Sequence, residues 1–239
     1  MIRVARLTKF FDGQVVLDDV SLEVHDGELV VLLGASGEGK TVLLKHLIGL
    51  LKPDRGEVYI DQTKISDLDE KELLKIRRNM GYLFQEGALY DFFNVSENVA
   101  FPLCEHTRMS KKEIKKKVEE ILKMVDLVGV GDKFPSELSG GMKKRAALAR
   151  CIILGSKIIL CDEPTSGLDP IRSRDISDLI KNVSKRLRCT TVVTSHDITN
   201  SFRIADRIAI IHDNKIVAFG TPEEIRTSGQ PYVREFIST

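Results

Sequence analysis

The eight residues from 34 to 41 constrain this chain more than any other segment, because they follow an apolar run directly and fit the pattern G-x-x-x-x-G-K-[ST]. Glycines at these positions let the backbone turn tightly and aim N–H groups at phosphate oxygens, while the lysine adds a positive charge and the threonine hydroxyl can hold Mg²⁺. A helix predicted over 42–49 would place its N-terminus against the same anion. The alternative is a glycine-rich turn before an ordinary helix. The loop reads Gly34-Ala35-Ser36-Gly37-Glu38-Gly39-Lys40-Thr41, after Leu29–Leu33.

Composition and charge are those of a globular protein. The 239 residues are 42% apolar and 30% charged, with a net charge of +1, so a substantial core is available and the strongly basic balance of many nucleic-acid-binding domains is missing. The sequence has neither an apolar run of about 20 residues nor the apolar region of a signal peptide. We therefore expect no nucleic-acid partner, and we expect any membrane-spanning helices to belong to another chain. Four scattered cysteines should be reduced, small apolar residues of a cytosolic protein: Cys104, Cys151, Cys161 and Cys189.

Short strands are predicted on both sides of the glycine loop. Alternating apolar residues at Val20, Leu22 and Val24 indicate a strand, and hairpins are expected at 56–65 and 208–219. The near-continuous apolar segments 29–33, 158–161 and 191–194 are typical of parallel strands covered on both faces. Ligands of open α/β sheets bind beyond the carboxyl ends of such strands. The polar residues that follow these strands should therefore converge with the glycine loop.

Helices are predicted from apolar residues at helical spacing and from capping residues. Residues 110–127 indicate an amphipathic helix, 66–80 a more charged one, and Ser139 and Thr221 should each cap a helix, the latter with Glu224 as a capping-box partner. A short strand is expected at 82–84. The lysines of the 110–127 helix are either an ordinary solvated face or a patch for anionic lipid: Lys111, Lys112, Lys115, Lys116 and Lys117.

Further motifs follow the glycine loop in a fixed order. Residues 138–142 read Leu-Ser-Gly-Gly-Met, 20 residues before Asp162-Glu163, and Ser166-Gly167-Leu168-Asp169 and His196 come later. With the loop as Walker A motif, this order resembles an ATP-binding-cassette (ABC) ATPase from about residue 2 to 225. The resemblance implies an α/β fold in which a RecA-like P-loop NTPase core and an antiparallel β subdomain together take up about 1–87 and 155–225. A helical subdomain (about 88–154) and a C-terminal extension (about 226–239) complete it.

The resemblance also implies how catalysis is divided among the motifs. Lys40 and the loop amides would hold the β- and γ-phosphates of ATP, while Thr41 and Asp162 would position Mg²⁺. Gln85 resembles the glutamine that touches metal and attacking water, Glu163 the carboxylate that orients or deprotonates that water, and His196 the histidine near the γ-phosphate. Each has a plainer alternative: Asp162 could cap a helix after Pro164, Glu163 could be a surface carboxylate, and His196 could be structural.

Two other features of the resemblance concern adenine and the second protomer. Phe11 aligns with the aromatic that stacks on adenine, with Phe10 as competitor and core packing as the alternative for both. The helix start at Ser139, Gly140 and Gly141 would complete the active site of the opposite protomer, and Asp169 would also cross that interface. The resemblance therefore implies a two-fold homodimer that encloses two ATP molecules.

Two residues depart from the family pattern. Met142 replaces the commoner glutamine after the two glycines, and Val42 replaces the commoner hydroxyl residue after Thr41. Val42 forfeits a hydrogen bond near the α-phosphate that would contribute about 0.5–1.5 kcal/mol. We expect somewhat weaker nucleotide affinity rather than inactivity.

The segments 85–90, 94–103 and 231–236 indicate which kind of cassette this is. Together with Leu-Ser-Gly-Gly-Met they resemble the ATPases of the Mla/Mce group of bacterial lipid transporters, in which the cassette pairs with a membrane permease and an MCE-domain protein. That resemblance implies a peripheral location on the cytoplasmic face of the inner membrane, with residues 86–103 as the groove for the permease. The alternatives are the ATPase of an amino-acid or other small-solute importer, and a non-transport ATPase of iron–sulfur assembly.

Overall fold

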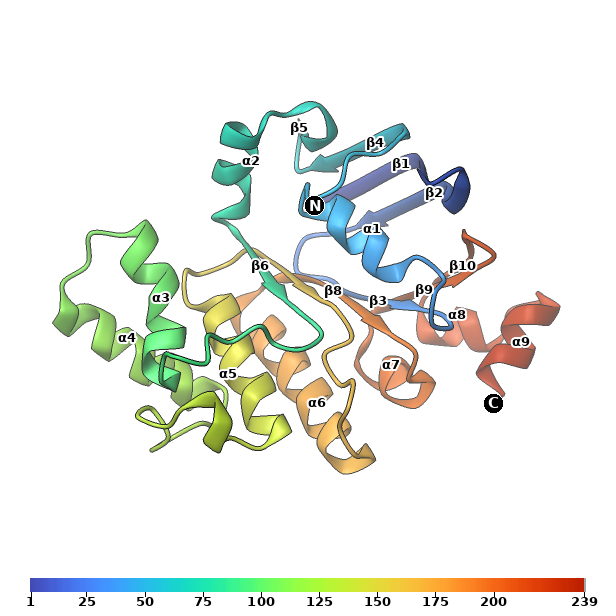
Figure 1. The fold of residues 1–239 in the computed structure, drawn as a ribbon. Coiled ribbons are helices and arrows are strands. Elements are labelled where there is room, and N and C mark those ends of the chain that lie inside the picture. The colour runs from blue at the N-terminus through green and yellow to red at the C-terminus, as the bar shows by residue number, and fades with distance from the viewer. Residues whose placement is uncertain (239) are drawn as a thin grey trace. The chain divides into compact units, whose positions relative to one another are not determined.

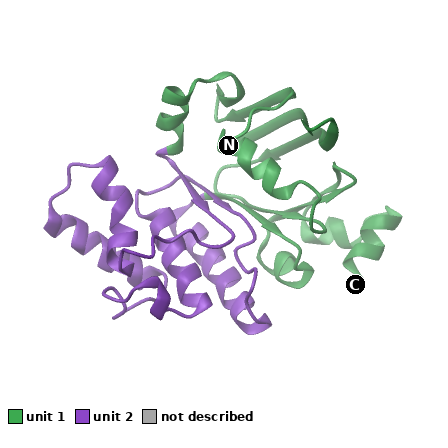
Figure 2. Cartoon of the chain, in the orientation of Figure 1, with its two compact units in different colours: residues 1–77, 190–239 green, residues 78–189 purple. Residues whose placement is uncertain are grey.

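The computed structural model describes residues 1–238, which divide into two compact units. One unit combines residues 1–77 with the chain from Thr190 onward, and the other is the continuous segment Arg78–Cys189 (Figure 2). The second unit is therefore inserted, in sequence, between the two parts of the first.

An antiparallel sheet in the order β2-β1-β4-β5 forms one part of the first unit (Figure 1). Alternating apolar residues build it, and the predicted stripe Val20, Leu22 and Val24 is confirmed, since each side chain is at most 3% exposed. The hairpin predicted at 56–65 is also confirmed. The strands are β1 Ile2–Phe11, β2 Gln14–Val24, β4 Arg55–Ile60 and β5 Thr63–Lys64.

The buried strand β3 (Leu29–Leu33) organises the other part of the first unit. It pairs in parallel with β8 (Thr190–Ser195) and with β9 (Arg207–His212), and β10 (Lys215–Gly220) pairs antiparallel with β9. All residues of β3 and β8 are buried, as expected of parallel strands covered on both faces. The register sets Leu33 opposite Ser195, so the segments that follow the two strands leave the sheet side by side.

Six short helices complete the described part of the first unit. The helix after the glycine loop begins at Lys40, two residues earlier than predicted, and the predicted capping box of Thr221 and Glu224 is present. The apolar α1 residues Leu43, Leu44 and Leu47 are fully buried. The elements are α1 Lys40–Leu47, the 3-10 helix η1 Ile65–Asp67, α2 Glu70–Arg77, α7 Ile198–Ile204, α8 Pro222–Arg226 and α9 Pro231–Ile237.

The second unit holds the parallel pair β6 (Met80–Leu83) and β7 (Ile158–Cys161), with Leu83 opposite Cys161. Strand β6 was predicted at 82–84. It begins two residues earlier than predicted, and Phe84 lies outside it. Helix α5 contacts α3, α4, α6 and β6, so it is the centre of this unit's packing. The helices are α3 Val95–His106, α4 Lys111–Met124, the 3-10 helix η2 Pro135–Glu137, α5 Gly140–Ile152 and α6 Pro170–Leu187.

Helix α4 is the predicted amphipathic helix. Ser110 caps it with Glu113 as capping-box partner, and its apolar residues Val118, Ile121 and Leu122 are buried. Four of the five lysines on its other face are exposed and Lys117 is half-buried. Cys161 and Cys189 are buried, as expected of small apolar residues, whereas Cys104 is exposed.

Candidate functional site

The phosphate-binding loop connects β3 to α1, and each glycine at its ends has a structural reason. A Cβ on Gly34 would lie 2.6 Å from the carbonyl oxygen of Ile211, and one on Gly39 would lie 2.7 Å from the carbonyl oxygen of Val16. Gly39 also has φ +84 and Gly37 has φ +89, a region that other residues rarely enter. No larger side chain fits this path of the backbone at 34 or 39.

Lys40 lies over the loop that precedes it. Its side chain is only 5% exposed, and its Nζ donates to the carbonyl oxygens of Gly34 at 2.9 Å and Ala35 at 2.7 Å. The N-cap Gly39 offers no side-chain cap and the first turn of α1 has no acidic residue. The helix dipole and the lysine charge therefore both favour an anion at this helix start. Thr41 and Val42 are half-buried in the first turn.

His196 and Phe11 lie in the same unit as the loop. His196 is exposed and comes directly after β8, and Asp197 caps α7 just beyond it. Because Ser195 pairs with Leu33, His196 and Gly34 leave neighbouring strands at the same edge. Phe11 ends β1 with 41% of its surface exposed and with the Lys9 Nζ 5.3 Å from its ring centre, whereas Phe10 is half-buried. Phe11 is thus the more exposed of the two rings, and whether it stacks on a base stays a prediction.

Asp162 follows β7 in the second unit. Its N–H donates to the Leu83 carbonyl at 2.8 Å, and its carboxylate accepts a 3.2 Å hydrogen bond from the Tyr82 hydroxyl. Burial, together with the neighbouring Asp162 charge, raises the pKa of Tyr82 well above its usual value, so Tyr82 remains a hydrogen-bond donor. Asp162 does not cap a helix, because the next helix begins at Pro170 with Asp169 as its N-cap. That alternative interpretation was wrong.

Glu163 has a left-handed backbone with φ 44°, which is uncommon for a residue other than glycine. A tight turn holds this conformation, since the Ser166 N–H donates to the Glu163 carbonyl at 3.1 Å. The Gln85 side-chain amide donates to the Ser166 hydroxyl at 3.2 Å. The side chain of Gln85, after β6, and the backbone of Glu163, after β7, are therefore joined through Ser166. Strained backbone of this kind occurs often at functional sites.

Lys144 of α5 is buried in the second unit and contacts the same region. Its Nζ donates to the Gln85 carbonyl oxygen, and its side chain is 7% exposed. Burial lowers the pKa of Lys144, while the charges of Glu86 and Glu163 oppose that shift. Lys144 thus links the helix that starts at Gly140 to the Gln85 segment and places a positive charge near Glu163.

The start of α5 is capped by Ser139, whose hydroxyl accepts from the Met142 N–H at 3.4 Å. A Cβ on Gly140 would lie 3.2 Å from the Leu168 side chain, so this helix start lies beside the segment that ends at Asp169. The Asp169 carboxylate caps α6 by accepting from the Arg172 N–H at 3.0 Å. Ser139 and Gly140 are exposed and Gly141 is half-buried.

The predicted site residues fall into two groups. One unit holds the loop 34–41 with Val42, Phe11 and His196, and the other holds Gln85, Asp162, Glu163, Asp169 and the helix start 139–141. Sequence reasoning missed Tyr82, Lys144 and Ser166. Tyr82 stands between the buried Gly81 and Leu83 of a strand, and alternation marks it as facing away from them. Nothing local to the sequence marks Lys144, because its neighbours are also basic.

Each helix within residues 1–238 is too short or too polar to span a lipid bilayer.

Sequence comparison relates the chain to transporter ATP-binding proteins. The family described as ABC transporter matches residues 17–166. The chain is 45% identical over 99% of its length to a protein of Mycobacterium leprae named probable ribonucleotide transport ATP-binding protein mkl, of which it spans 68%. It is 42% identical over 99% of its length to MlaF of Haemophilus influenzae, an intermembrane phospholipid transport system ATP-binding protein, of which it spans 90%. It is 39% identical over 93% of its length to MetN of Carboxydothermus hydrogenoformans, a methionine import ATP-binding protein, of which it spans 66%.

Solved structures give the same relation. A dimeric ATP-binding cassette in a post-hydrolysis state, bound to ADP and Pi, superposes with a TM-score of 0.85 at 36% identity, over 93% of this chain and 99% of that one. The fold expected from the sequence, a P-loop ABC nucleotide-binding domain, is therefore confirmed. This chain belongs to the ABC transporter family, as one of its ATP-hydrolysing cassettes.

Proposed function

We propose that this ATPase drives the transport of phospholipid between bacterial membranes, as the peripheral subunit of a complex with a permease and an MCE-domain protein. The observation that carries the proposal is the match to MlaF, which extends over 99% of this chain and 90% of that protein at 42% identity. It therefore includes the segments 86–103 and 231–236, which lie outside the motifs common to ABC ATPases. The relatives named for methionine and ribonucleotide transport keep small-solute import as the alternative.

ATP would bind through the loop 34–41 and the start of α1. The buried amino group of Lys40, which two loop carbonyls hold in place, would exchange these acceptors for the more strongly accepting β- and γ-phosphate oxygens. Gly34 to Val42 would supply the surrounding backbone and Phe11 the ring beneath adenine. Thr41 and Asp162 are oxygen donors of the kind that Mg²⁺ prefers, and Gln85 offers a third. Bound Mg²⁺ would neutralise charge that develops on the phosphates.

Hydrolysis would depend on Glu163 as the residue that orients or deprotonates the attacking water. Its left-handed backbone and the turn to Ser166 fix where its side chain begins. Gln85 would contact water and metal from the adjacent strand end, and the exposed His196 would contact the γ-phosphate. Lys144 would hold the Gln85 backbone in place.

The helix start at Ser139, Gly140 and Gly141 would serve the neighbouring protomer. It presents backbone N–H groups and a hydroxyl, the same chemistry as the loop at 34–41. Asp169 directly follows Leu168, whose side chain lies beside Gly140 in the same unit. Two protomers would therefore enclose two ATP molecules, each bound by one loop and by the partner's helix start.

The phosphate-loop assignment is tested by Lys40→Ala. We expect this variant to lose binding of a fluorescent ATP analogue, because a buried charge that faces the phosphates is removed. Lys45→Ala, on the same helix, is the matched control and should bind as the wild type does. Nucleotide affinity that survives in Lys40→Ala contradicts the assignment.

The lipid assignment is tested by purifying the tagged full chain from native membranes with its bound partners. A permease and an MCE-domain protein are expected, with phospholipid in the purified complex. Recovery of a soluble amino-acid-binding protein would support the importer alternative, and recovery of a sulfur-assembly scaffold would support the non-transport one.

A further inference from the structure

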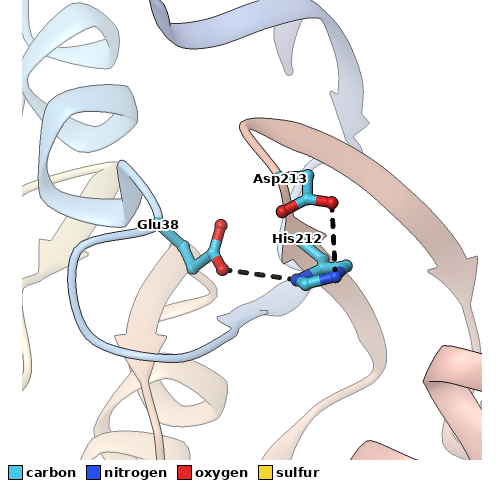
Figure 3. Close-up of side chains that lie close together, drawn as sticks. All are labelled: Glu38, His212 and Asp213. Atoms are coloured by element: carbon cyan, nitrogen blue, oxygen red, sulfur yellow. Dashed lines mark hydrogen bonds and ion pairs between the residues drawn. The ribbon is translucent and has the colours of Figure 1, made fainter.

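The C-terminal end of β9 meets the phosphate-binding loop at two points. Gly34 comes so close to the Ile211 carbonyl that a Cβ would lie 2.6 Å from its oxygen. Glu38 turns its side chain toward the next residue of β9, His212, and the Glu38 carboxylate lies 3.3 Å from Nδ1 of the imidazole (Figure 3). Two consecutive residues of one strand therefore contact both the beginning and the middle of the loop.

The C-terminal helix α9 covers His212. The Tyr232 ring stacks on the imidazole with ring centres 3.5 Å apart and an interplanar angle of 6°, and Phe236 stacks on Tyr232 at 5.7 Å. Val233, beside Tyr232, is fully buried and anchors the helix. Burial and the charges of Glu38, Asp213 and Glu235 raise the pKa of Tyr232, so the ring stays a neutral phenol. The stack fixes the plane of the imidazole and with it the direction of Nδ1.

The three polar residues Glu38, His212 and Asp213 also have the composition of a metal site. Their geometry favours hydrogen bonding instead. Glu38 faces Nδ1 at 3.3 Å, whereas Asp213 faces the other ring nitrogen, Nε2, at 3.5 Å. A single ion bound to one nitrogen would leave the carboxylate at the other unused. The tautomer with a proton on Nδ1 donates to Glu38 directly.

Glu38 is the residue where a side-chain tether has the most effect on the loop. It stands between Gly37, with φ +89, and Gly39, with φ +84, and glycine leaves the backbone free on both sides. The Glu38 side chain is only 18% exposed and the His212 side chain 30%. The contact with His212 therefore restrains a segment that its own backbone does not restrain.

We propose that His212, held by Tyr232 of α9, is a positioning residue for the phosphate-binding loop, so that the C-terminal extension tunes the affinity of this ATPase for Mg-ATP. The inference rests on the assignment of residues 34–41 to ATP binding. A loop freed from His212 has to be ordered by the nucleotide itself, and this cost lowers affinity. Loss of the contact between His212 and Glu38 leaves the water-activating residues unchanged, so kcat at saturating ATP should be preserved.

The test compares KM and kcat for ATP hydrolysis by the full chain, with affinity for a fluorescent ATP analogue as a second readout. His212→Phe keeps an aromatic ring for the stack but loses the hydrogen bond to Glu38, and Tyr232→Ala loses the stack. Both should raise KM and the dissociation constant about three- to tenfold, the size expected for one lost hydrogen bond, with kcat changed less than about twofold. Tyr232→Phe should retain wild-type values, as should the control Arg234→Ala on the exposed face of α9.

Coupling between the two residues is the stricter test. If the two residues form one tether, the double variant His212→Phe with Tyr232→Ala should bind ATP no more weakly than the single variant with the lower affinity. Effects that multiply, an unchanged KM in folded His212→Phe, or a fall in kcat alone would each overturn the inference. If Tyr232→Ala does not fold, His212→Phe alone decides the test.

The Lys40→Ala variant separates failure of this inference from failure of the loop assignment. Lost binding in Lys40→Ala with an unchanged KM in His212→Phe overturns this inference only. Retained binding in Lys40→Ala overturns the loop assignment on which the inference rests.

Discussion

Glu163 is the single side chain on which turnover should depend most. Glu163→Gln keeps the shape of the side chain and its left-handed backbone but removes the charge that would orient or deprotonate water, so ATP hydrolysis should fall by about 10²- to 10⁴-fold while ATP binding persists. Phosphate release and nucleotide binding, measured on the same preparation, separate the two effects. Glu119→Gln on the exposed face of α4 serves as the control. Hydrolysis at the wild-type rate in Glu163→Gln would remove Glu163 from its proposed role.

A different carboxylate, Glu28, should contribute stability that depends on pH. Its side chain is 11% exposed and accepts from Arg207 and from the His25 N–H, joining the starts of β3 and β9. Burial opposes the shift, yet these hydrogen bonds leave the folded-state pKa of Glu28 below its usual value of 4.5. The stabilisation is therefore complete above about pH 4.5 and is lost as the pH falls through the lower, folded-state pKa.

Glu28→Gln should accordingly lower the free energy of unfolding by about 1.5–3 kcal/mol at neutral pH, as for a hydrogen bond to a charged group. The difference from wild type should shrink in acid, because wild-type Glu28 then becomes protonated and, like the glutamine of the variant, carries no charge. Urea unfolding across a pH series measures both. A difference that stays constant from neutral pH into strong acid would show that the charge contributes nothing.

The sequence reveals those site residues whose spacing relative to strands and motifs is characteristic of a known site. Gln85, Asp162, Glu163 and His196 were found because each follows a short strand at a spacing that matches a known pattern. Lys144 was not found, because its role comes from a helix that folds back on the Gln85 segment. Whether the residues that were found perform the proposed chemistry remains a prediction.

At the scale of elements, one side chain organises the loop before α3. Asn98 is fully buried. Its amide donates to the carbonyls of Tyr90, Phe93 and Asn94, and its side-chain oxygen accepts from the Tyr90 N–H. It therefore satisfies four backbone groups of the segment 90–94, which carries the exposed Phe92.

Asn98→Ala should destabilise the protein by about 2–4 kcal/mol, because several backbone groups lose their partner at once. Asn94→Ala, which removes only the cap of α3, should cost about 1 kcal/mol. Chemical unfolding gives both values. Equal effects of the two substitutions would show that the several hydrogen bonds of Asn98 contribute no more to stability than a single helix cap.

Most elements followed from periodicity and capping residues, and the misses have identifiable causes. The strands 29–33 and 158–161 and the helix after Ser110 were predicted within a few residues, because their apolar patterns are continuous. Helix α3 was not predicted, because Pro102 lies inside it and proline normally argues against a helix interior, although Asn94 and Glu97 form a capping box at its start. That capping box is a local signal, and it would have been sufficient to place the start of α3.

For the whole molecule, the proposed function requires two protomers. Glu163→Gln with Mg-ATP should elute as a species of twice the 26.8 kDa chain mass, because bound triphosphate would join the two halves without being hydrolysed. Gly140→Asp should bind ATP and stay monomeric, since it places a negative charge at the helix start that meets the partner's phosphates. Light scattering after size exclusion measures both. A strictly monomeric Glu163→Gln protein saturated with Mg-ATP, alone and with its membrane partners, would contradict the shared site.

The insertion of residues 78–189 between the two parts of the first unit has a consequence for biosynthesis. When β3 leaves the ribosome, neither of its neighbours exists, because β8 and β9 begin only at Thr190 and Arg207. The inserted segment is continuous and has all of its own strands and helices close in sequence. The strand that leads into the phosphate loop, in contrast, can pair with its neighbours only after more than half of the chain has been synthesised. Long-range pairing of this kind slows folding and exposes apolar strands meanwhile. Nascent chains that stop before β8 should therefore be the form most dependent on chaperones.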